Sequence, residues 1–139
     1  SVAEYATVFA RGAAVSAAHP TLLILPGGLV WADTPWAEAT CEQHGNAARI
    51  AAVPVHVYAE TWTPESVTVE TFLGERFARD FLPVVDAACG RQEVWINETG
   101  FATSAGRTER DQAAWWARAI ATFAATPRVT HVGVYEIKD

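Results

Sequence analysis

The sequence lacks the features that would place it in a membrane or on nucleic acid. No run of 18 or more apolar residues occurs, so no membrane-spanning helix is expected. Ten Lys and Arg against 16 Asp and Glu give a net charge of −6, so the basic footprint of a nucleic-acid-binding protein is missing. The first residues show no basic start followed by an apolar block, so no signal peptide is predicted. Because the chain does not begin with Met, this says little about location.

Patterns for metal, phosphate and serine-nucleophile chemistry are also missing. The four His have no usable local spacing, and Cys41 and Cys89 form no CxxC pair, so neither a metal site nor a cofactor is expected. Gly27-Gly28 lacks the G-x-G-x-x-G spacing of a dinucleotide site, and G-x-S-x-G is absent. The two cysteines are expected to be buried, unpaired thiols, with a disulfide between them as the alternative.

What is present indicates one globular domain. The chain has 139 residues, of which 50% are hydrophobic and 19% charged, enough for a sizeable core. No linker or low-complexity stretch divides it, so residues 1–139 are treated as a single segment.

Helical and strand patterns alternate along the chain. Helices are expected over 2–18, 35–50, 67–88 and 108–124, and apolar strands over 21–28, 52–62, 93–100 and 130–139. This alternation predicts an α/β protein with four parallel strands and covering helices. Either an open doubly wound sheet or a barrel fits. A (β/α)8 barrel needs eight strands and about 250 residues, so this chain could supply only half of one.

Polar and aromatic side chains gather where each predicted strand ends. In parallel α/β proteins function lies at the carboxyl ends of the strands. The second strand carries His56, Tyr58, Glu60 and Trp62, which share a face if the strand stays regular. In the third strand Glu98 is expected on the face of Val94 and Ile96, with Trp95 turned away to pack under a helix. Trp31 follows the first strand, where a tryptophan is well placed to stack on a sugar ring.

The most informative stretch is EVWINETGFAT, residues 93–103, in which an apolar strand ends on a carboxylate. On one layout Tyr58 and Glu98 point into the same cavity from neighbouring strands. A tyrosine hydroxyl can then donate a hydrogen bond to the carboxylate, orient it and favour its ionised form. Such a carboxylate suits nucleophilic attack in retaining glycoside hydrolysis. The alternative is a structural carboxylate that caps the next loop or pairs with an arginine.

These motifs resemble the clan A glycoside hydrolases, the large group of retaining (β/α)8-barrel enzymes. EVWINETGFAT is similar to their seventh strand, whose glutamate, matched by Glu98, is the catalytic nucleophile. VPVHVYAETW resembles the sixth strand, with His56 and Tyr58 at the His-x-Tyr positions that contact substrate and nucleophile. TLLILPGGLVW and VGVYEIKD are similar to the fifth and eighth strands, the latter in β-xylosidase-like and other polysaccharide-cleaving members.

The resemblance implies the C-terminal half of a TIM barrel, from helix 4 to strand 8. It implies hydrolysis of O-glycosidic bonds in an oligo- or polysaccharide by a retaining double displacement. Glu98 would be the nucleophile and Tyr58 would orient it. Substrate contacts would come from His56, Trp62, Trp31, Glu136 and Glu60. A secreted or periplasmic location is slightly favoured by the resemblance.

The chain departs from the family pattern in lacking the general acid/base. In the family this is the glutamate of an Asn-Glu pair after the fourth strand, and the only Asn-Glu here is Asn97-Glu98. Glu60 and Glu136 fit sugar-hydroxyl ligands better than leaving-group acids. The chain alone is therefore expected to be inactive. Its expected partners are a carbohydrate and either an N-terminal half-barrel or a second copy of itself. The alternative function is a non-catalytic carbohydrate-binding or scaffold half-barrel.

Overall fold

The computed structural model describes residues 1–30, 32–44, 50–62 and 67–135. Four strands, β1 (Leu29–Val30), β2 (Ala52–Val57), β3 (Glu93–Thr99) and β4 (Val129–Val134), form one sheet in the order β1-β2-β3-β4. Every neighbouring pair is parallel. The predicted α/β class with four parallel strands is confirmed. The strands follow one another in sequence order across the sheet. In an open doubly wound sheet, later strands would lie on both sides of the first strand.

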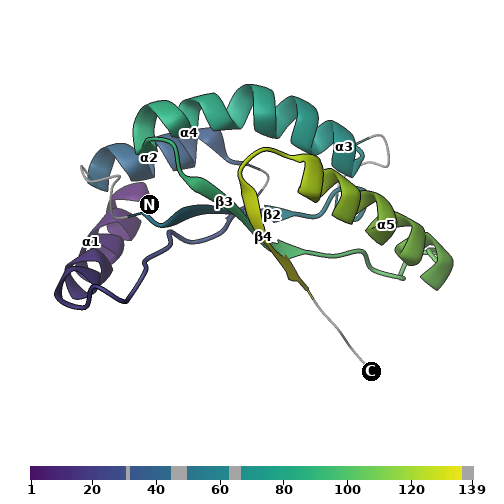
Figure 1. The fold of residues 1–139 in the computed structure, drawn as a ribbon, viewed down its shortest axis with the longest axis horizontal. Helices are drawn as coiled ribbons and strands as arrows, with labels where there is room; N and C mark the ends of the chain where they lie inside the picture. The colour runs from purple at the N-terminus through teal and green to yellow at the C-terminus, as the bar shows by residue number, and fades with distance from the viewer. Residues whose placement is uncertain (31, 45–49, 63–66, 136–139) are drawn as a thin grey trace.

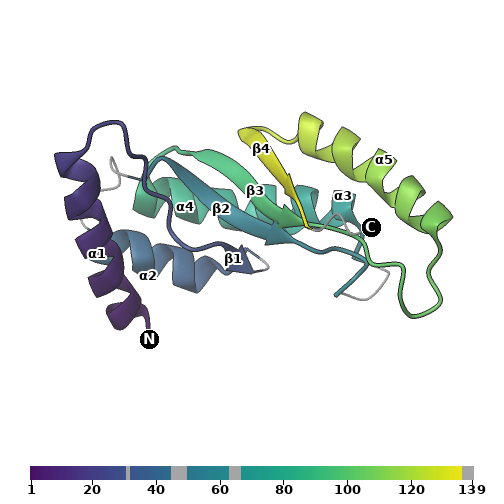
Figure 2. The ribbon, with the colours of Figure 1, turned by 90° about the horizontal axis from the view of Figure 1, so that it is seen from below.

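The helices cover one face of this sheet. They are α1 (Val2–Ala18), α2 (Thr34–His44), a long helix built from α3 (Val69–Thr71), η2 (Phe72–Phe81) and α4 (Leu82–Cys89), and α5 (Glu109–Ala125). Figure 1 shows α2, α4 and α5 on one side of the sheet, and Figure 2 looks onto the other side, where no described helix lies. α1 lies at the β1 end of the layer and α5 at the β4 end. We call these two sides the helix face and the open face.

The core lies between the sheet and its helices. Alternate residues of the two central strands, Val53, Val55 and Val57 in β2 and Val94 and Ile96 in β3, are at most 2% exposed. They pack in one cluster with large aromatic side chains from the helices, namely Phe72, Phe77, Phe81, Trp115 and Phe123. Burial of this apolar surface is the main term that stabilises the fold.

Helix ends follow from local sequence. Thr108 is the N-cap of α5 and forms a capping box with Asp111. Ser1 and Glu4 form the same motif at the start of α1. The helix expected over 67–88 is present, but its middle ten residues, Phe72–Phe81, adopt π-helical hydrogen bonding that the sequence pattern did not predict. None of the helices in the described part has the length and hydropathy needed to cross a bilayer.

The first strand differs from its prediction. A buried strand was expected over 21–28, but regular pairing is limited to Leu29–Val30, and Ile24 makes only an isolated bridge to Ile50. Pro26 has no N–H to donate, and Gly27-Gly28 favours irregular backbone. Leu23 is 73% exposed, so this segment is not the buried strand that its composition indicated.

The prediction of unpaired thiols is wrong. Cys41 of α2 and Cys89 of α4 form a disulfide, with their Cα atoms 5.1 Å apart. Both residues are buried beneath the sheet. The two cysteines are 48 residues apart in sequence, so the bond closes a large loop of the chain.

Candidate functional site

An irregularity in β3 determines where its polar end points. Val55 of β2 pairs with Ile96, but the next residue, His56, pairs with Glu98, so Asn97 is an extra residue in β3. Paired residues of neighbouring parallel strands point to the same side of the sheet. Because Ile96 faces the helices, Glu98 would do so too in a regular strand. The extra residue turns it to the open face instead, as β-bulges near functional sites commonly do.

Two predictions about β3 are therefore corrected. Glu98 does not share a face with Val94 and Ile96, because the bulge intervenes. Trp95 does not pack under a helix: it pairs with Pro54, which lies on the face of His56, and its ring lies 4.1 Å from that of His131. Trp95 thus belongs to the open face, on the same side as Glu98.

The bulge brings Glu98 together with both residues predicted to accompany it. The Tyr58 hydroxyl donates to Glu98 Oε2 at 3.0 Å, and His56 Nδ1 lies 3.4 Å from the same oxygen. Tyr58 is 5% exposed, whereas the Glu98 side chain is 37% exposed. Within the described residues Oε1 of Glu98 has no hydrogen-bond partner. The protein thus holds one oxygen of a partly exposed carboxylate and leaves the other without a hydrogen-bond partner in this part of the chain.

The tyrosine is fixed in its neutral, donating form. Burial of the ring raises the pKa of Tyr58 far above its ordinary value, and the hydrogen bond to Glu98 and the carboxylate's negative charge raise it further. The hydroxyl thus remains protonated throughout the physiological range. It acts on Glu98 as a permanent donor and orients the carboxylate.

A glycine makes room for this cluster. A Cβ atom at Gly28, beside β1, would lie 2.9 Å from Nδ2 of Asn97 and closer still to Nε2 of His56. Any side chain there would displace His56, so Gly28 has a definite steric role.

The turn after β2 directs Glu60 away from the open face. The strand ends at Val57, and backbone N–H groups of Thr61 and Trp62 donate to the Tyr58 carbonyl. Glu60 has φ +64°, in the left-handed region that is uncommon for residues with a Cβ. The strand does not stay regular as far as Glu60, so the shared face that regularity would have given Glu60 with His56 and Tyr58 does not form.

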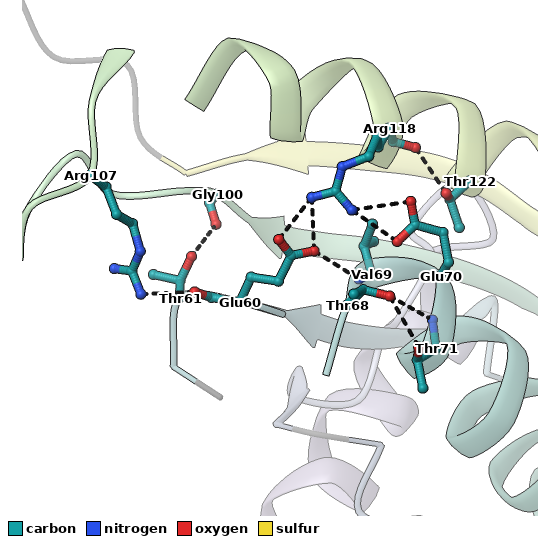
Figure 3. A network of polar contacts seen from close by, with 10 residues as sticks. All are labelled: Glu60, Thr61, Thr68, Val69, Glu70, Thr71, Gly100, Arg107, Arg118 and Thr122. Atoms are coloured by element: carbon teal, nitrogen blue, oxygen red, sulfur yellow. Dashed lines mark hydrogen bonds and ion pairs between the residues drawn. The ribbon is translucent and has the colours of Figure 1, made fainter. Parts of the chain in front are cut away.

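Glu60 instead joins a network of charges with α5 and the start of α3, which Figure 3 draws. Arg118 donates to both Glu60 carboxylate oxygens at 2.8 and 3.0 Å and also binds Glu70. The Val69 N–H donates to Glu60 as well, and the Glu60 side chain is 16% exposed. Burial acts to raise the pKa of Glu70, but hydrogen bonds from its own backbone, Thr68 and Arg118 hold that pKa below its ordinary value. With these partners, Glu60 stabilises the turn.

Trp62 follows this turn and lies at the rim of the sheet. Its ring stacks on that of Tyr58, with centroids 4.3 Å apart and planes 18° apart. It remains 64% exposed, which is a large apolar surface for a tryptophan to leave in water. Trp62 therefore keeps exposed ring surface on which a ligand ring could stack. Trp31 and Glu136, the other two predicted substrate contacts, lie outside the described residues.

The cluster can act as a nucleophile or as a hydrogen-bond acceptor. No group of three His, Cys, Asp or Glu side chains among the described residues could hold a metal ion. A partly exposed carboxylate with one oxygen held by the protein can accept from a sugar hydroxyl or attack an electrophilic carbon. No family model matches the chain, and comparison with curated protein sequences found no significant similarity.

Proposed function

We propose that this chain provides the nucleophile half of a retaining glycoside hydrolase site, with Glu98 as the attacking carboxylate. The observation that supports the proposal best is the asymmetry of Glu98. Tyr58 and His56 both contact Oε2, whereas Oε1 has no hydrogen-bond partner among the described residues, and the side chain is 37% exposed. Attack on an anomeric carbon needs such an oriented, accessible oxygen.

The arrangement of the fold fits this role. The parallel strands follow in sequential order with helices on one face, as in a segment of a (β/α)8 barrel, and Glu98 lies near a strand's carboxyl end. In such a barrel the open face would be the interior. The half-barrel proposal therefore includes a partner for both sheet edges, either a further half-barrel or a second copy of this chain.

Retaining hydrolysis needs a second carboxyl group about 5–5.5 Å from the nucleophile. Within the described residues the partners of Glu98 are Tyr58 and His56, and Glu60 is occupied by Arg118. The proposal accordingly assigns the acid/base to residues outside the described part of this chain. This same observation favours a second candidate, a carbohydrate-binding half-barrel without catalysis.

A substrate that needs no acid tests the nucleophile directly. In a 2,4-dinitrophenyl 2-deoxy-2-fluoro-glycoside, Glu98 Oε1 would bond to C1 while the C1–O bond breaks. The dinitrophenolate leaves with the electron pair and needs no proton. The fluorine slows hydrolysis of the resulting ester, so the glycosyl-enzyme accumulates. Intact mass spectrometry with xylosyl and glucosyl reagents should show one added glycosyl group, mapped to the peptide that contains Glu98.

Two variants complete this test. Glu98→Gln should abolish labelling, whereas Glu93→Gln, an exposed glutamate of the same strand, should label normally. If the unmodified chain shows no labelling by either reagent, or if labelling persists in Glu98→Gln, the nucleophile proposal is wrong. Binding of oligosaccharides without labelling would favour the non-catalytic alternative.

A further inference from the structure

A second concave region adjoins the Tyr58–Glu98 pair but does not include Glu98. It is a cavity of about 680 Å³ beyond the carboxyl ends of β2, β3 and β4 and beside the start of α5. Its volume is within the range of about 300–1,000 Å³ typical of small-ligand sites. Among the residues that line it are Tyr58, Trp62, Thr103, Ser104, Glu109 and Trp116.

The lining combines aromatic rings with neutral polar groups. Trp62 and Trp116 come from the turn after β2 and from α5, whereas hydroxyls of Thr103 and Ser104 come from the loop after β3. None of the described lining residues is Lys, Arg or His, and Glu109 adds a carboxylate, so an anionic ligand would be repelled. A neutral ring with apolar faces and hydroxyl edges fits this lining, because aromatic groups pack on its faces and polar groups bind its edges.

The walls of the cavity are held in place before any ligand binds. Arg118 fixes Glu60 from one side of the turn, and Arg107 donates to the Glu60 carbonyl at 2.8 Å from the other. The Thr61 hydroxyl donates to the Gly100 carbonyl, which joins the turn to the loop after β3 (Figure 3). A preformed wall lowers the ordering cost of binding.

We infer that this cavity is a second sugar-ring subsite, in which one pyranose unit stacks on Trp62 while the next unit along the chain reaches Glu98. The inference rests on the proposed function in taking the ligand to be a carbohydrate. Tyr58 connects the two sites, since its hydroxyl binds Glu98 and it also lines the cavity. A ligand of several sugar units would therefore bind more tightly than a single unit.

Isothermal titration of the chain with xylohexaose, cellohexaose and the two monosaccharides tests this. At least one hexasaccharide should bind, and more tightly than its monosaccharide. Trp62→Ala should weaken that binding by about tenfold, since loss of a stacked aromatic contact costs up to roughly 1.5 kcal/mol. Leu23→Ala, which removes a 73% exposed apolar side chain elsewhere, is the matched control and should bind as the parent does.

Glu109→Gln distinguishes a sugar from a cationic ligand, which aromatic rings and a carboxylate could also hold. A glutamine still exchanges hydrogen bonds with hydroxyls, so hexasaccharide binding should change by less than about threefold. Titration with choline should show no binding that depends on Glu109. Choline binding lost in Glu109→Gln, together with no hexasaccharide binding, would overturn the subsite.

The outcomes separate this inference from the proposed function. Hexasaccharide binding that depends on Trp62, without covalent labelling of Glu98, would support the subsite and reject the nucleophile. Labelling of Glu98 with hexasaccharide affinity unchanged in Trp62→Ala would support the nucleophile and reject the subsite. Absence of binding by both hexasaccharides would also reject the subsite.

Discussion

The two faces of the sheet are built on different principles. On the helix face, alternating Val and Ile side chains meet a layer of Phe and Trp, and nearly all of this surface is dry. On the open face, His56, Trp95 and Glu98 remain partly accessible, and Tyr58 is buried but hydrogen-bonded to a carboxylate. The helix face supplies stability without chemistry. The open face holds the groups that can bind or react, and their positions depend on single backbone irregularities.

The largest contrast should appear when one aromatic ring is removed from each side. Phe77 is fully buried under the sheet, so Phe77→Ala should lower the free energy of unfolding by about 3–5 kcal/mol. Trp62→Ala removes a larger ring, but one that is 64% exposed, and should cost no more than about 1 kcal/mol. Urea denaturation followed by circular dichroism measures both. Equal losses for the two variants would contradict the division between a stabilising and a functional face.

The disulfide belongs to the helix face, and its loss should have the next largest effect. Cross-linking residues 48 apart restricts the unfolded chain, and a loop of this length corresponds to about 4 kcal/mol in the chain-entropy treatment. Reduction should therefore lower the Tm substantially. A Cys41→Ala/Cys89→Ala variant should start at the lower Tm and be insensitive to reductant. Two thiols that alkylate in the unreduced, denatured protein would show that the bond does not form.

The sequence predicted the helix face well because its rules are local and repetitive. The spacing of apolar residues predicted four helical regions, and the structure has a helix in each. The predicted contact between Tyr58 and Glu98 is confirmed. The backbone geometry that produces it differs from the regular strand that was expected. A regular β3 would have turned Glu98 under the helices, and the bulge at Asn97 reverses this.

The remaining differences depend on contacts between residues far apart in sequence. The left-handed turn at Glu60 is held by Arg118, which lies 58 residues further along the chain. The pairing of Cys41 with Cys89 requires α2 and α4 to lie side by side, which neither cysteine's neighbours reveal. One sequence signal points toward the cavity. The segment GFATSAG after β3 is too polar and glycine-rich to continue a strand, which indicates a loop at this end of the sheet.

Variants of the charge network around Glu60 test whether Arg118 of α5 stabilises the turn after β2. Arg118→Met keeps much of the side chain's length but leaves the Glu60 carboxylate, 16% exposed, without its cation. Because Arg118 is itself 42% exposed, we expect a loss of only about 1–2 kcal/mol in unfolding free energy. Arg79→Met removes an exposed ion pair to Asp80 and should leave the unfolding free energy nearly unchanged. Losses of similar size in both variants would mean that the Glu60 network adds nothing beyond a surface pair.

The smallest effect concerns Tyr58, where the open face contributes to stability through a hydrogen bond. Tyr58→Phe removes the donor to a carboxylate that is 37% exposed, so the loss near neutral pH should be about 1 kcal/mol. The folded-state pKa of Tyr58 is raised by burial and by Glu98, so its contribution is complete below the unfolded value near 10. Above that value unfolding releases a proton that the folded state retains, and the contribution declines as pH rises. The difference in unfolding free energy between parent and Tyr58→Phe should therefore be constant from pH 7 to 9 and shrink above pH 10. A difference that grew above pH 10 would mean that the tyrosine ionises more readily in the folded chain, and that the hydroxyl is not the fixed donor that orients Glu98.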